Sequence, residues 1–147
     1  MTRLQQIIEA VEARLMSITQ DNGYYTDIGY NVFTATSMPL PQSKLPAIVY
    51  HFGAGADDEM RAIGLQSWVI NVEIAVLTTK DLYASVINII ADIFKAIGEG
   101  AKDNWGGLAD EMREITFEIN PEEVFEKIIN AGKVKISILY STELWRL

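Results

Sequence analysis

Residues 68–77 alternate between two kinds of side chain, and this alternation constrains the fold more than any other feature of the sequence. One phase is wholly apolar and the other is mixed; the apolar phase consists of Trp68, Ile70, Val72, Ile74 and Val76. Successive side chains of a β-strand point to opposite faces of its sheet. The pattern therefore predicts a long strand with one fully apolar face and one mixed face.

Two amphipathic helices are predicted to cover the apolar face. The first begins at a capping box, Thr2 with Gln5, and stops at Asn22-Gly23. The second begins around Thr79 to Asp81 and runs to Gly98. Its apolar stripe is broad, as expected for a helix that lies flat on a sheet: Leu82, Val86, Ile89, Ile90, Ile93, Phe94 and Ile97.

Four other segments complete the predicted sheet. A weak strand signal covers residues 30–33, and clearer strands cover residues 47–52, 115–119 and 134–140. Asn120-Pro121-Glu122-Glu123 resembles a helix start, so we expect a short helix over 124–129, with a strand turning back as the alternative. Strands that follow one another without helices imply antiparallel pairs. The fold class expected is therefore α+β: a mostly antiparallel sheet of four to five strands with two long helices packed on one face.

Composition indicates one domain over residues 1–147, made in a reducing compartment. The chain has 147 residues, 49% of them hydrophobic, and no cysteine. No signal-peptide pattern or membrane span is found, so a protein without a membrane partner is expected. The formal charge of −8 argues against specific nucleic-acid binding. Many of the carboxylates lie between Glu99 and Glu126, which indicates either a solvated face or a surface that repels an anion.

Each candidate motif for catalysis, cofactor binding or metal binding lacks residues that its chemistry requires. His51 is the only histidine, and no serine lies in a G-x-S-x-G elbow. Gly53-Ala54-Gly55 lacks the third glycine of a dinucleotide fingerprint, and the acidic residues that follow would repel a pyrophosphate. Residues 98–102 lack the end of a P-loop. We therefore expect a protein that is not an enzyme and has no cofactor and no metal site.

What remains are features that suit association with other chains. An acidic connection between two predicted strands contains Asp57, Asp58 and Glu59. A proline-bearing loop contains Met38 and Leu40. Trp145 is either a tethered core residue or an interface anchor. These six residues are the predicted partner-binding positions.

The order of elements resembles the tail terminator and tail completion proteins of long-tailed phages and prophages. The likeness covers nearly the whole chain. It consists of the order of the elements and a few short sequence segments, and it includes no diagnostic motif. The segments are residues 22–29, after the first helix; Leu45-Pro46-Ala47-Ile48-Val49, after the proline loop; and Ile138-Leu139-Tyr140-Ser141-Thr142, in the last strand.

The resemblance implies a structural virion protein of the tail, made in the host cytoplasm. Such subunits form a ring, commonly a hexamer, that caps the tail tube and joins it to the head connector. The expected partners are therefore copies of itself, the tail tube protein and the head–tail connector protein. An acidic lumen would keep DNA from sticking, and the candidates for it are Glu111, Glu114, Glu118 and Glu122. The alternatives are another connector or baseplate component, or a small-molecule-binding regulatory domain.

Overall fold

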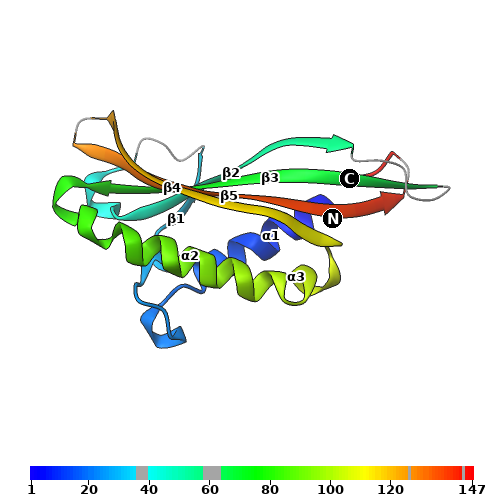
Figure 1. The fold of residues 1–147 in the computed structure, drawn as a ribbon, viewed down its shortest axis with the longest axis horizontal. Helices are drawn as coiled ribbons and strands as arrows, with labels where there is room; N and C mark the ends of the chain where they lie inside the picture. Colours follow the sequence, from blue (N-terminus) through cyan, green and yellow to red (C-terminus); the bar gives the residue numbers. More distant parts are fainter. Residues whose placement is uncertain (36–39, 58–63, 126, 144) are drawn as a thin grey trace.

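The computed structural model describes residues 1–35, 40–57, 64–125, 127–143 and 145–147, with only the backbone of 54–57 and 124–125. It is an α+β fold in which two long helices lie on one face of a five-stranded, mostly antiparallel sheet, as predicted (Figure 1). The strands are β1 (Val32–Thr34), β2 (Ala47–Asp57), β3 (Leu65–Thr79), β4 (Glu111–Phe125) and β5 (Ile128–Glu143). The helices are α1 (Arg3–Met16), α2 (Val86–Ala101) and the short α3 (Asn104–Gly107).

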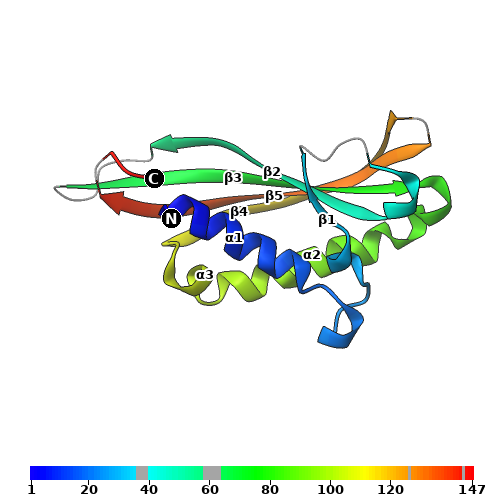
Figure 2. The ribbon, with the colours of Figure 1, turned by 180° about the vertical axis from the view of Figure 1, so that it is seen from behind.

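Strand β3 lies at the centre of the sheet, whose order is β1-β2-β3-β5-β4. Its predicted alternation is confirmed, because Ile70, Val72, Ile74 and Val76 are all buried under the helices. Helix α1 packs below the side of the sheet that carries β1, and α2 runs below the side that carries β5 and β4 (Figure 2). The main core lies between this face of the sheet and the two helices.

Helix α1 starts as predicted but ends early. The Thr2 hydroxyl accepts a hydrogen bond from the Gln5 backbone N–H at 3.1 Å. The helix ends at Met16 and not at Asn22-Gly23. A separate 3₁₀ turn, Gln20–Asn22, follows, and Thr19 caps it. Gly23 ends that turn with φ of 87°, so this glycine does terminate a helical turn, although not α1.

Helix α2 begins later than predicted, at Val86. Residues Lys80–Ser85 form a 3₁₀ helix instead. Leu82 therefore lies outside the apolar stripe of α2, and it is partly exposed. The buried apolar side chains of α2 recur at helical spacing along one side, as the broad apolar pattern indicates: Val86, Ile89, Ile90, Ile93, Ala96 and Ile97.

Two predictions about connections are wrong. Strand β1 pairs with β2 in parallel, with Val32, Phe33 and Thr34 opposite Ile48, Val49 and Tyr50. Residues 124–129 do not form a short helix: β4 runs to Phe125 and β5 starts at Ile128. Pairing of Ile128 and Ile129 with the end of β3 outweighs the local helix-start signal. Pro121 is tolerated because it lies at a bulge of an edge strand.

The face of the sheet turned away from the helices is largely open. A small second cluster covers one end of it, where residues 40–45 fold over β2 and β3; its members are Leu40, Leu45, Ala47, Val49, Leu77 and Ile128. Over the rest of this face the alternating residues are mixed: His51, Asn71, Glu73 and Lys135 are polar or charged, whereas Val69, Ala75 and Leu139 are apolar. Within the described parts of the chain, no helix is both long enough and apolar enough to cross a membrane.

Candidate functional site

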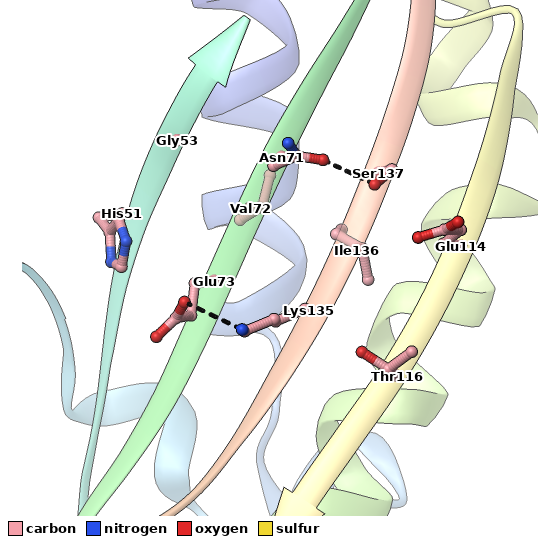
Figure 3. A pocket seen from close by; sticks show the side chains of 10 residues that line it. All are labelled: His51, Gly53, Asn71, Val72, Glu73, Glu114, Thr116, Lys135, Ile136 and Ser137. Carbon is pink, nitrogen blue, oxygen red and sulfur yellow. Dashed lines mark hydrogen bonds and ion pairs between the residues drawn. The ribbon is translucent and has the colours of Figure 1, made fainter.

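A shallow hollow of about 270 Å³ lies on the open face of the sheet (Figure 3). Side chains from four neighbouring strands surround it, because residues of one phase on β2, β3, β5 and β4 project to the same side. Its lining is mostly polar: His51, Gly53, Asn71, Val72, Glu73, Glu114, Thr116, Lys135, Ile136 and Ser137.

Most of the charged side chains in this hollow already form ion pairs between neighbouring strands. Glu73 lies 3.9 Å from the Nζ atoms of both Lys133 and Lys135. The Ser137 hydroxyl donates to Asn71 Oδ1 at 2.7 Å. These contacts join side chains of the neighbouring strands β3 and β5 and stabilise the open face of the sheet.

His51 projects from β2 opposite Glu73 in the register and is exposed. Among the described residues, no hydrogen bond joins it to a serine or threonine hydroxyl that it could activate, and no ion pair joins it to a carboxylate that could orient it. The same residues contain no group of three or more histidine, aspartate or glutamate side chains placed to hold a metal ion. The absence of enzyme activity remains a prediction.

The four glutamates predicted for a lumen all lie on β4 and are exposed. Glu111, Glu114 and Glu118 face the open side of the sheet, opposite Leu139, Ser137 and Lys133 of β5. Glu122 follows a bulge and lies opposite Asn130. The row is not uniformly negative, because Lys133 lies 4.0 Å from Glu118 and Arg113 lies 3.4 Å from Glu111.

Phe117 and Ile119, in the other phase of β4, form an exposed apolar surface together with Ile87 of α2. We call these three residues the β4–α2 flank. Phe117 is 58% exposed, although its ring meets that of Phe94 edge to face at 5.5 Å. Ile87 is 68% exposed and lies seven residues before Phe94, so it shares that flank of α2. Among the described strands β4 is an edge, which is why these apolar residues stay uncovered.

A second exposed apolar group lies at the far end of β5. Trp145 is 83% exposed and has a left-handed backbone, with φ of 65°. Left-handed geometry costs an L-residue roughly 1–2 kcal/mol. Hydrogen bonds hold the segment: among them, Arg146 N–H donates to Glu143 O at 3.2 Å, the Thr142 hydroxyl donates to Arg146 O at 2.8 Å, and Leu4 N–H donates to Leu147 O at 2.9 Å. We call residues 145–147 the Trp145 hook.

Each of the other predicted partner-binding residues is either buried or has no described side chain. Leu40 is buried in the second cluster, so its side chain is a core residue in the isolated chain and not an exposed contact. The backbone of Asp57 ends β2, opposite Trp68. Met38, Asp58 and Glu59 lie outside the described residues. Of these six positions, the structure shows only Trp145 as an exposed side chain.

The attachment of the loop between α1 and β1 to helix α2 was not identified from the sequence. The buried carboxylate of Asp92, on α2, accepts hydrogen bonds from Tyr25 N–H at 3.0 Å, Thr26 N–H at 2.8 Å and the Thr26 hydroxyl at 2.6 Å. The loop presents Tyr25 and Tyr30, which are both exposed. An aspartate within an apolar helical stripe is the signal that could have revealed this attachment.

A comparison of the chain with models of known protein families found no match, and a comparison with curated proteins also found none.

Proposed function

We propose that this protein is a structural subunit that assembles with copies of itself, as a tail terminator-like ring component of a phage or prophage tail. The observation that carries the proposal is the exposure of large apolar side chains at two separate places, the β4–α2 flank and the Trp145 hook. Isolated apolar residues are common on surfaces, but an exposed aromatic residue with a fixed backbone is typical of an interface anchor.

The order of elements that resembles tail terminators supports the more specific part of the proposal. In such a ring, the open sheet face with Glu111 and Glu114 would face the lumen and weaken contacts with passing DNA. The tail tube protein and the head–tail connector protein are the other proposed partners.

Sedimentation velocity and native mass measurement, without and with the tail tube protein of the same phage or prophage, test the proposal. We expect a ring-sized species in at least one of the two samples. A monomer in both would contradict the proposal. Binding to purified connector or baseplate protein, without binding to tube protein, would favour another virion component.

The hollow of Figure 3 is one candidate site for a small-molecule-binding regulatory domain. At about 270 Å³ it lies below the range of roughly 300–1,000 Å³ typical of ligand pockets. A saturable thermal shift with a metabolite, lost in Lys135→Ala, would favour that function.

A further inference from the structure

The Trp145 hook is arranged to present its indole. Its backbone is held by the contacts with Leu4, Thr142 and Glu143 described above, and the Trp145 N–H points to Gln66 Oε1 at 3.5 Å. The indole nevertheless stays 83% exposed. Ordering a side chain on binding reduces affinity, so an aromatic group on an ordered backbone is well suited to anchor a contact.

The β4–α2 flank offers a matching surface. Bulges occur between Met112 and Glu114 and between Ile119 and Glu122, so the strand is regular only from Glu114 to Ile119. Phe117 and Ile119 lie within this regular part, with Ile87 beside them on α2. Glu114 and Glu118 project from the same part to the other side of the strand. The apolar surface and the exposed carboxylates therefore lie on the two opposite faces of one edge strand.

The hook and the flank of one copy cannot meet. Phe117 lies opposite Val134 of β5, and the hook follows Glu143 at the end of that strand. Nine residues of β-strand span roughly 30 Å. Contact between the two surfaces therefore requires two molecules.

Charge favours this pairing over the symmetric alternatives. The chain carries a net charge of −8, so two copies repel unless a basic group meets an acidic one. Two β4 edges would bring their glutamates together, which disfavours a symmetric β4–β4 contact. The surface around the hook carries Arg3 and Arg146 with one glutamate, Glu143. The Arg146–Glu143 ion pair, at 3.4 Å, is exposed and can be exchanged at little cost.

We propose that the Trp145 hook of one copy docks on the β4–α2 flank of a second copy, with Trp145 against Phe117, Ile119 and Ile87 and with Arg146 near the glutamates of β4. This inference rests on the proposed self-assembly and specifies its surfaces. Because the two surfaces are unlike, the copy that docks its hook keeps a free flank, and the copy that receives it keeps a free hook. Repeating the contact extends a chain of copies or closes a ring.

Two variants that each lack one surface test this arrangement. Trp145→Ala removes the hook, and Ile87→Asp disables the flank at an exposed position; Phe117→Ser is a second flank variant. We expect each variant alone to self-associate at least roughly tenfold more weakly than the wild type. An equimolar mixture of Trp145→Ala and Ile87→Asp retains one intact pair of surfaces. We expect it to form a dimer that grows no further, by native mass spectrometry and sedimentation velocity.

Tyr30→Ser is the matched control, because it removes another highly exposed aromatic residue from a different surface. It should assemble like the wild type, and circular dichroism should show all variants folded. Wild-type-like assembly of Trp145→Ala, or a mixture that stays monomeric while the wild type assembles, overturns the inference and leaves the proposed function standing. A wild type that is monomeric alone at its highest soluble concentration also overturns it. The proposed function is then tested by the sample that contains tail tube protein.

Discussion

Trp105 and Trp145 share an unusual backbone and differ in everything that surrounds them. Both have left-handed φ angles, 58° and 65°. Trp105 is 4% exposed, and its ring packs so closely on Gly100 that a Cβ there would overlap it. Trp145 is 83% exposed. Burial against α2 offsets the backbone cost at Trp105, whereas no comparable burial does so at Trp145. The contrast separates a residue that builds the fold from one that is free for a partner.

Removing each indole should give the largest difference between the two regions. Trp105→Ala leaves a cavity in the core, so we expect it to lower the free energy of unfolding by about 3–5 kcal/mol. Trp145→Ala should lower it by less than about 0.5 kcal/mol, because the side chain is exposed. Urea unfolding of both variants measures this. Equal losses in the free energy of unfolding would contradict the distinction between a core tryptophan and an exposed one.

The conformation of the loop that presents Tyr25 and Tyr30 should depend on a buried residue, as the conformation of the backbone at Trp105 does. Asp92→Ala leaves three donors on Tyr25 and Thr26 without their acceptor, so we expect a loss of about 1–3 kcal/mol. Faster amide hydrogen exchange at Tyr25 and Thr26 should accompany it. Asp81→Ala, at an exposed position, is the control and should change neither quantity. Unchanged exchange in Asp92→Ala would show that another contact holds the loop.

Tyr50 links α1 to β2 and should make stability sensitive to alkaline pH. Burial, followed by the hydrogen bond to Glu12 and its charge, raises the pKa of Tyr50 above its ordinary value of 10.0. The folded state therefore favours the protonated phenol. Its contribution is fully present below pH 10.0 and is lost as the pH rises toward the folded pKa.

Tyr50→Phe should consequently lose less stability than the wild type when the pH rises above 10.0. Burial also raises the pKa of Tyr140, but both proteins share that contribution. Thermal unfolding followed across alkaline pH compares the two slopes. Identical slopes would show that Tyr50 does not contribute to the pH dependence.

The smallest effect on stability is expected from Trp145→Gly. Glycine adopts a left-handed backbone without the strain of a side chain, but it also makes the unfolded chain more flexible. We expect anything from no change to a gain of about 1 kcal/mol in the free energy of unfolding. Differential scanning calorimetry measures it. A loss larger than about 1 kcal/mol would place Trp145 among the residues that build the fold.

Sequence patterns predicted the parts of the structure that one element determines by itself. The apolar phase of β3, the stripe of α2 and the wet face that carries Glu114 and Glu118 follow from periodicity alone. Segment 124–129 was mispredicted because its partner, the end of β3, lies far away in the sequence. The exposure of Phe117 and Trp145 depends on which strand forms the edge and where β5 ends. No single segment encodes either property.

Directed disulfide formation tests the hook–flank contact most directly, because the chain contains no cysteine of its own. Copies that carry only Arg146→Cys are mixed with copies that carry only Glu118→Cys and are oxidised under mild conditions. We predict a covalent dimer that contains one copy of each variant. Replacing the Glu118→Cys variant with Glu9→Cys, at an exposed position on α1, should abolish it. Assembly without cross-linking between Arg146→Cys and Glu118→Cys, or equal cross-linking to Glu9→Cys, would contradict the account.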